Sequence, residues 1–234
     1  MPTRWIPYVK VLVHLVCLLP ALKLIEQYQS GAFGLMADPV NRITHFTGYW
    51  ALFILLASLA VTPLRRLNPR LSNLIRFRRM LGLYAFFYAT LHLATYLFLF
   101  SGYDVPGAVA GLRAGHPTVL VEDWKAVWPT MLDDLKKRRF IQVGFASWVI
   151  LLALAATSPA AIMRRMGGRS WQTLHRMVYV AAALAVIHYW WLVKTGNRAP
   201  APMTLILGAL LAARAVWAFR RSRRSTPART TAAV

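Results

Sequence analysis

Two histidines, His92 and His188, lie inside long apolar stretches of the sequence and could together bind a metal cofactor. An ionisable side chain is costly in a segment that crosses a bilayer, so it usually binds a ligand or relays charge. His92 lies about 18 Å from the start of its stretch, and His188 lies about 8 Å from the end of its own. Both stretches cross in the same direction, which predicts similar depths for the two histidines. Two facing helices of this kind can supply both axial ligands of a haem.

A third histidine, His175, precedes His188 by thirteen positions in the same apolar stretch. On one continuous helix this spacing separates them by about 20 Å along the axis and about 140° around it. The spacing argues against both binding the same haem. His175 is predicted to serve an inner redox site, as a further haem ligand or where quinone or flavin delivers electrons. The alternative is a polar role near the lipid headgroups.

Other basic residues near the ends of the apolar stretches allow several interpretations. His14 could be a ligand opposite His175, but an interhelical contact is favoured. His45 could ligate, relay a proton to a quinone or cap its helix, with capping or packing as the default. Three arginines just before the stretch of His92 suit lipid anchoring, and their planar guanidinium groups also suit haem propionates or a flavin phosphate. These are Arg76, Arg78 and Arg79.

The elements that position these residues are predicted to be membrane helices. The chain is 58% hydrophobic and 15% charged, which is too apolar for an ordinary soluble domain. The predicted fold class is all-α, a six-helix transmembrane bundle over residues 1–220 with a basic cytoplasmic tail at 221–234. Pro63 and Pro159 are expected to follow helix ends, and the long connection at 101–139 is expected to lie at the membrane interface. The apolar segments are 8–25, 45–62, 80–100, 140–157, 173–193 and 203–219.

The distribution of charge predicts how the bundle is oriented. The net charge is +21, but the basic residues form short blocks between apolar runs, which favours membrane lipids as partners and no nucleic acid. With the N-terminus in the cytoplasm, the inner segments hold more Lys and Arg than the outer loops, and all seven acidic residues lie outside. This predicts an N-in, C-in orientation, and the main point against it is the basic block at 136–139. Cys17 is the only cysteine, so a cysteine-ligated iron–sulfur cluster and a c-type haem are excluded.

Several motifs over roughly residues 5–220 resemble the MsrQ family. This family is the haem-binding membrane subunit of the bacterial periplasmic methionine sulfoxide reductase system and belongs to the ferric-reductase-like transmembrane group. The order and spacing of the motifs make the resemblance specific. They are HFTGYWAL at 45–52, VTPLRR at 61–66, RFRRMLGLYAF at 76–86, LHLATY at 91–96, SWVILLALAATS at 147–158, and WQTLHRMVY followed by IHYWWLVK.

The resemblance implies a ferric-reductase-like domain in the bacterial inner membrane, with b-type haem and FMN as cofactors. It implies that the chain takes electrons from the quinone pool or a cytosolic flavin reductase. The chain would pass them to a periplasmic molybdenum-containing subunit that reduces methionine sulfoxide in oxidised proteins. Catalysis would lie on that partner. The family's haem histidines match His92, His175 and His188.

Two questions stay open at this point. Relatives with two haems carry a histidine pair on each of two helices, whereas here Arg78 and Arg79 occupy the inner position of the His92 helix, so the number of haems is one or two. Two rival functions also stay open. One is a quinol-dependent ferric reductase that acts without a partner, and the other is a transporter or structural membrane protein with incidental histidines.

Overall fold

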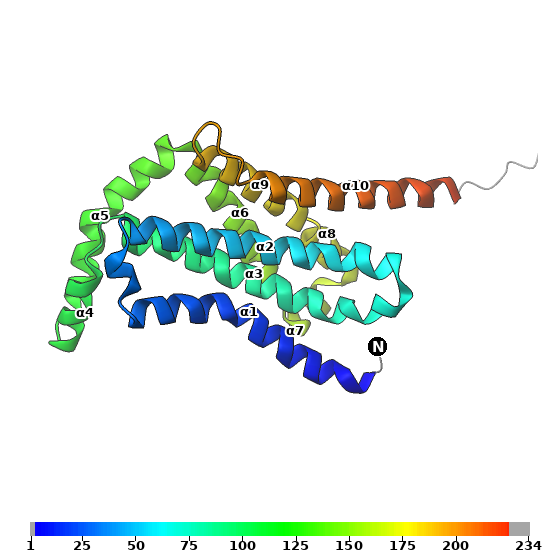
Figure 1. Ribbon diagram of the computed structural model, residues 1–234, viewed down its shortest axis with the longest axis horizontal. Coiled ribbons are helices and arrows are strands. Elements are labelled where there is room, and N and C mark those ends of the chain that lie inside the picture. The colour runs from blue at the N-terminus through cyan, green and yellow to red at the C-terminus, as the bar shows by residue number, and fades with distance from the viewer. Residues whose placement is uncertain (1–2, 225–234) are drawn as a thin grey trace, which may run out of the picture.

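Every regular element in the part of the chain that the structure describes, residues 3–224 of a computed structural model, is helical (Figure 1). Short helices η1 (Thr3–Trp5), η2 (Ala32–Leu35), η3 (Pro69–Leu74) and the π-helical η4 (Tyr96–Phe100) join or extend the longer ones. The α-helices are α1 (Ile6–Gln29), α2 (Pro39–Leu67), α3 (Ile75–Thr95), α4 (Val105–Arg113), α5 (Thr118–Lys137), α6 (Arg139–Ala156), α7 (Ala160–Met166), α8 (Gly168–His175), α9 (Val178–Leu192) and α10 (Ala201–Arg224).

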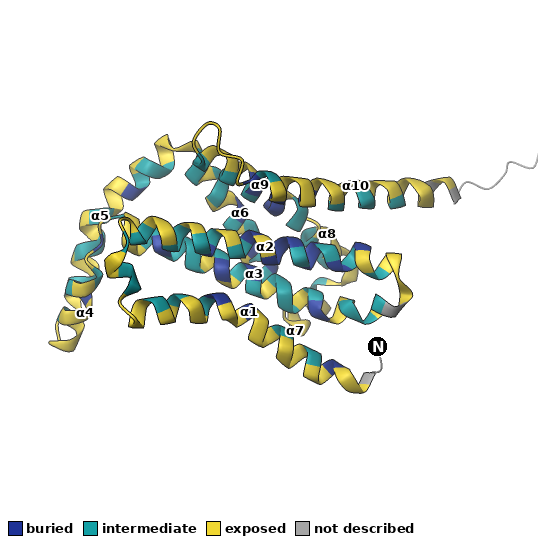
Figure 2. Cartoon of the chain, in the orientation of Figure 1, coloured by how far each residue is buried: buried dark blue, intermediate teal, exposed yellow. Residues whose placement is uncertain are grey.

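The centre of the bundle is α2. It packs along α3 and also contacts α9 and α10, while α6 packs along α9. Figure 2 shows the buried residues gathered on these facing helices, whereas α1 and α10 expose most of their side chains. Apolar helices that expose large hydrophobic side chains are expected in a lipid environment. The buried core comprises Leu52, Ile54, Leu55, Leu56, Leu59, Ala85, Tyr88, Leu151, Ala181, Ala182, Val186, Met203 and Leu207.

The all-helical membrane class is confirmed, but the count of six crossings is not. Within the described residues five spans are long and apolar enough to cross a membrane. The predicted segment at 173–193 is not one continuous helix, because α8 ends at His175 and α9 begins at Val178. Between them the amides of Met177 and Tyr179 bond to carbonyls three residues earlier, a tighter turn than the α-helix. The five spans are Ile6–Gln29, Pro39–Leu67, Leu71–Phe100, Arg139–Ala156 and Ala201–Arg221.

The predicted helix end at Pro63 is wrong, because α2 continues through this proline to Leu67. Proline has no amide hydrogen, so the carbonyl four residues earlier, that of Leu59, loses its usual helical donor. The guanidinium group of Arg214, from α10, supplies a replacement, with Nη2 donating to the Leu59 oxygen at 2.7 Å. A contact between helices therefore compensates for the proline inside α2.

The first helix is bent, and a tyrosine from α3 lies at the bend (Figure 1). The Tyr88 hydroxyl donates to the carbonyl of Cys17 at 2.7 Å and accepts from the amide of Ala21 at 3.1 Å. These two groups would otherwise bond to each other within α1, so the hydroxyl is inserted into the helical ladder next to Pro20. Tyr88 is fully buried and fixes α1 to the bundle.

The long connection at 101–139 is helical rather than irregular. It forms α4 and α5, which lie at the end of the bundle opposite the N-terminus and the far end of α10 (Figure 1). Asp104 caps α4 by accepting from the Gly107 amide, and Tyr103 packs against Trp124 with ring centroids 5.2 Å apart. At the other end of the chain, α10 extends to Arg224, past the predicted start of the tail. The remaining tail residues, 225–234, lie outside the described part.

Candidate functional site

The rings of His92 and His188 face each other across the interior of the bundle. His92 comes from α3 and His188 from α9, and their ring centroids are 6.0 Å apart with an angle of 76° between the planes. Two imidazoles bound to one metal through Nε2, with bonds of about 2 Å, have centres roughly 6 Å apart. The sequence placed these residues at matched depth, and the structure brings them together.

A backbone carbonyl of α2 orients His92. Its Nδ1 lies 3.0 Å from the Thr44 oxygen, and because a carbonyl can only accept, Nδ1 carries the hydrogen. The imidazole can approach because the next turn of α2 presents Gly48. A Cβ added to Gly48 would lie 3.0 Å from Cε1 and 3.1 Å from Nδ1 of His92, too close for an ordinary contact. Any residue with a Cβ at position 48 would therefore make the ring shift by a few tenths of an ångström.

The same arrangement holds His188 in the second helix pair. Its Nδ1 donates to the Phe140 oxygen of α6 at 2.7 Å. Gly144 follows Phe140 by one helical turn, as Gly48 follows Thr44. A Cβ at Gly144 would lie 2.7 Å from Nδ1 of His188, so any larger residue would displace the ring.

In both histidines Nδ1 donates to a backbone carbonyl, and among the described residues Nε2 has no hydrogen-bond partner. Histidines that bind metals commonly donate their other ring nitrogen to a carbonyl, which sets the tautomer and the ring orientation. In the described part of the chain no group of three His, Cys, Asp or Glu side chains could hold a metal ion. Two facing imidazoles without further protein ligands fit haem, because the macrocycle supplies the remaining four bonds to iron. The pair therefore fits a haem better than a bare metal ion.

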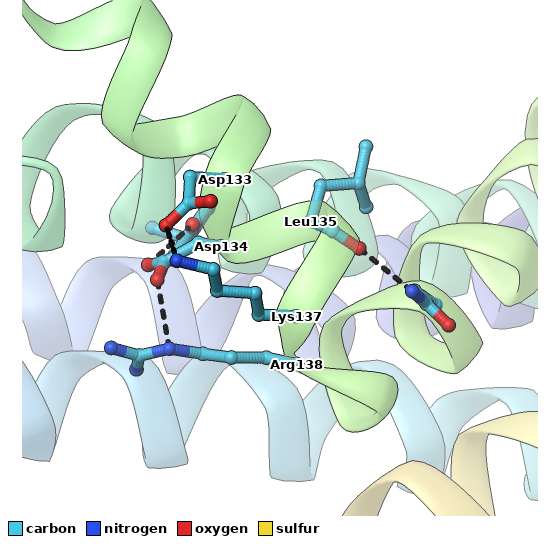
Figure 3. A network of polar contacts seen from close by, with 7 residues as sticks. Asp133, Asp134, Leu135, Lys137 and Arg138 are labelled. Carbon is cyan, nitrogen blue, oxygen red and sulfur yellow. Dashed lines mark hydrogen bonds and ion pairs between the residues drawn. The ribbon is translucent and has the colours of Figure 1, made fainter.

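A polar network fixes the helices around this pair at the end where α5 meets α6 (Figure 3). Tyr96, one turn beyond His92, donates to Oδ2 of Asp134 at 3.1 Å, and Oδ1 of Asp134 pairs with Arg138 at 2.8 Å. The side-chain Nε2 of Gln142 donates hydrogen bonds to the backbone carbonyls of Leu135 and Lys136. Because Phe140 lies within this junction, the network also positions the carbonyl that orients His188.

His175 lies apart from the pair and has a different environment. Its ring stacks on Trp171, with centroids 3.9 Å apart, and its Nε2 lies 3.2 Å from the Thr157 hydroxyl at the end of α6. Among the ring contacts of the described residues, His175 pairs with this tryptophan and not with another histidine. Within the described residues, His175 therefore has no part in the ring contact that joins His92 and His188.

The remaining candidate residues lie outside the pair as well. His14 of α1 contacts the Tyr84 hydroxyl through Nδ1 at 2.7 Å, the type of interhelical contact favoured from the sequence. His45 is exposed and does not cap α2, since the helix begins at Pro39 and Asp38 accepts from the Asn41 amide. The expected cap at His45 is wrong because the helix starts earlier. Arg76 and Arg79 are exposed, and Arg78 is half-buried.

The residues that the sequence analysis missed are those that hold the histidines. Gly48 and Gly144 could have been noticed as glycines inside predicted membrane helices, where small residues allow close approach. The carbonyls of Thr44 and Phe140 gave no signal, since backbone atoms acquire their role only from the way the helices are paired.

Comparison with known proteins agrees with this architecture. Residues 46–186 match the family described as "Ferric reductase like transmembrane component", which covers most of the helices around the histidine pair. The fold and site therefore define a ferric-reductase-like membrane protein.

Individual proteins that are similar to nearly the whole chain carry the name "Protein-methionine-sulfoxide reductase heme-binding subunit MsrQ". The protein of Xanthomonas axonopodis pv. citri is 44% identical, with 95% of this chain and 92% of the relative aligned. The protein of Xanthomonas oryzae pv. oryzae is 45% identical, and the alignment covers 92% of this chain and 89% of the relative. The protein of Ralstonia nicotianae is 39% identical, and the alignment covers 95% of this chain and 92% of the relative. This chain belongs to the MsrQ family.

Proposed function

We propose that this chain is a membrane electron-transfer subunit in which His92 and His188 hold one b-type haem. The observation that carries the proposal is the facing of the two rings at 6.0 Å, each with Nδ1 held by a carbonyl of the neighbouring helix. The printed name of the relatives, a heme-binding subunit, supports the same cofactor. When bound, the haem supplies reversible one-electron transfer.

The chain's own residues bind and orient this cofactor. The carbonyls of Thr44 and Phe140 fix the tautomers, and Gly48 and Gly144 leave room for the rings. His92 and His188 would hold the haem, and their imidazoles together with the largely apolar bundle would set its potential. Because Nδ1 of each ring is held by a carbonyl, both imidazoles would be oriented before a haem binds.

The proposed route of electrons runs from the end that carries α7 and α8 to the end that carries α4 and α5. The donor would be the quinone pool or a cytosolic flavin reductase, delivering electrons near His175. The acceptor would be a periplasmic molybdenum-containing methionine sulfoxide reductase subunit, in support of the repair of oxidised proteins. The relatives' name, which includes that reductase, supports this partner. FMN stays a prediction from the family resemblance, with Arg76, Arg78 and Arg79 as the candidate phosphate ligands.

The proposed topology is N-in and C-in, in the bacterial inner membrane, with α8 and α9 together forming a sixth crossing. The position of the N-terminus and the far end of α10 at the same end of the bundle supports it (Figure 1). The basic block at 136–139, which opposed this orientation, is partly neutralised. Lys137 pairs with Asp133 at 2.7 Å and Arg138 with Asp134 at 2.8 Å.

The decisive experiment is the visible spectrum and haem content of the purified protein beside His92→Ala and His188→Ala. Each variant is expected to lose most of its haem, because one axial ligand is removed. Retention of all haem by either variant would contradict the ligand assignment, and a colourless wild type would favour a transporter or structural protein. Reduction of chelated iron by quinol with no partner present would instead favour the ferric reductase.

A further inference from the structure

A pocket lies at the end of the bundle opposite α4 and α5, away from the histidine pair. Its volume is about 580 Å³, within the range of roughly 300–1,000 Å³ that is usual for small-molecule sites. It is formed where the last turns of α2, the junction between α8 and α9, and the second half of α10 meet. It is lined by Thr62, Arg66, Arg176, Tyr179, Arg214, Trp217, Ala218 and Arg221.

The charge of this pocket is strongly positive and uncompensated by protein carboxylates. Four of the eight lining residues are arginines, contributed by three separate parts of the chain. The sequence has no Asp or Glu between Asp38 and Asp104, and none after Asp134, so α2, α8, α9 and α10 carry no acidic side chain. Four guanidinium groups around one space repel each other and favour an anion between them.

Arg214 is held in the pocket wall by several specific contacts. Its guanidinium donates to the Tyr179 hydroxyl and to the Leu59 carbonyl, and it lies over the Tyr179 ring at 4.6 Å. Its Nε is buried without a hydrogen-bond partner, and so is the hydroxyl of Thr62. Unpaired buried polar groups cost free energy, and an anion with several oxygens could satisfy both after a small side-chain movement.

We propose that this pocket binds a phosphate-bearing anion. Guanidinium groups bind phosphate oxygens in a planar, bidentate manner, and a phosphate has enough oxygens to engage several arginines together. The volume exceeds that of a phosphate, so the group belongs to a larger molecule. Aromatic side chains of Tyr179 and Trp217 offer apolar surface for the rest of it. Two sources share this chemistry: the headgroup of an anionic phospholipid, and a soluble phosphate ester.

The test compares phosphate probes on the purified full chain by native mass spectrometry and titration. The probes are dioctanoyl phosphatidylglycerol, pyrophosphate, and dioctanoyl phosphatidylcholine as a lipid without net charge. Wild type is expected to bind one equivalent of an anionic probe and to prefer it at least tenfold over phosphatidylcholine. Binding of phosphatidylglycerol that pyrophosphate does not displace identifies a lipid as the source. Binding of pyrophosphate that displaces the lipid identifies a soluble ester.

Matched variants separate the pocket from general basic charge. Arg66→Gln with Arg176→Gln removes two exposed arginines of the pocket, and Arg164→Gln with Arg165→Gln removes two exposed arginines of α7. The pocket pair is expected to weaken binding about tenfold or more and the α7 pair less than twofold. Equal losses in the two, or no one-to-one binding in wild type, would overturn the proposal.

A third variant keeps the charge and changes only the wall of the pocket. Thr62→Val removes the unpaired hydroxyl and nearly preserves the volume of the side chain. It is expected to weaken binding severalfold while circular dichroism and elution volume stay unchanged. An unaltered affinity would overturn the part of the proposal that places the anion against this wall.

Discussion

Gly48 and Gly144 occupy equivalent positions in two separate helix pairs. Each lies one turn after the carbonyl that accepts from its histidine, and each would collide with that histidine if it carried a Cβ. The α2–α3 pair and the α6–α9 pair therefore present their imidazoles by the same local device. The candidate site depends on backbone shape as much as on the two histidine side chains.

Alanine at either glycine is expected to disturb the histidine without removing it. Gly48→Ala and Gly144→Ala should each lower haem affinity about tenfold or more, as changes behind a metal ligand commonly do. The measurement is haem titration of the apoprotein followed by the absorption spectrum. Gly144→Ala should have the larger effect, since its added Cβ would lie 2.7 Å from the ring against 3.0 Å for Gly48.

Two other helical glycines provide the control for this experiment. A Cβ at Gly82 would meet only the Ser58 hydroxyl at 3.8 Å, and one at Gly208 would meet nothing within 4 Å. Alanine at either position should leave haem affinity unchanged. Equal losses at all four glycines would show that the effect is general destabilisation and not displacement of a ring.

His175→Ala is expected to keep the haem held by His92 and His188. The reason is that His175 lies on α8, stacked on Trp171 and bonded to the Thr157 hydroxyl, away from the pair. Haem content per chain should equal that of wild type, while reduction of the haem by quinol or reduced flavin should slow severalfold. Loss of about half of the haem would instead show that His175 ligates a second one.

Tyr96→Phe removes the hydrogen bond that ties α3 to Asp134. A hydrogen bond to a charged group contributes about 1.5–3 kcal/mol when buried, and partial exposure of Asp134 lowers the expected loss to about 1 kcal/mol. The thermal midpoint of the purified protein should fall by a few degrees with haem retained. Tyr28→Phe, at an exposed tyrosine, is the matched control and should not change the midpoint.

Tyr88→Phe tests the attachment of α1. The lost hydroxyl bonds to both the Cys17 carbonyl and the Ala21 amide in a fully buried position, so the free energy of unfolding should fall by about 1–3 kcal/mol. Denaturant unfolding in detergent measures the change, and cleavage by added protease within residues 6–29 should become faster. Unchanged unfolding would mean that α1 closes its own hydrogen bond when the hydroxyl is absent.

The sequence was sufficient to predict that His92 and His188 lie close to each other. Both were predicted to lie in helices that cross in the same direction, so counting residues from the predicted helix ends gave their expected depths. The same counting could not reveal that α2 supplies the carbonyl for one and α6 for the other, because sequence spacing does not identify neighbouring helices. It also treated the stretch from His175 to His188 as one helix, whereas the structure interrupts it after His175.

The other differences from the prediction have separate causes. Pro63 normally indicates a helix end, but a donor from α10 takes the place of its missing hydrogen. Asp38, and not His45, begins α2, because a carboxylate followed by proline is a better start than a histidine further along. The connection at 101–139 was predicted only to lie at the membrane interface, and its helices α4 and α5 leave that prediction open.

The bond between Arg214 and the Leu59 carbonyl limits which substitutions positions 63 and 214 can accept during evolution. Pro63 leaves the Leu59 carbonyl without a helical donor, and Arg214, 155 residues further along the chain, bonds to it. This bond holds α2 and α10 in one position relative to each other along their axes. Replacing Pro63 by a residue with an amide would restore the donor for the Leu59 carbonyl within α2, and Arg214 would keep only its contacts with Tyr179. Residues 63 and 214 should therefore covary among related sequences.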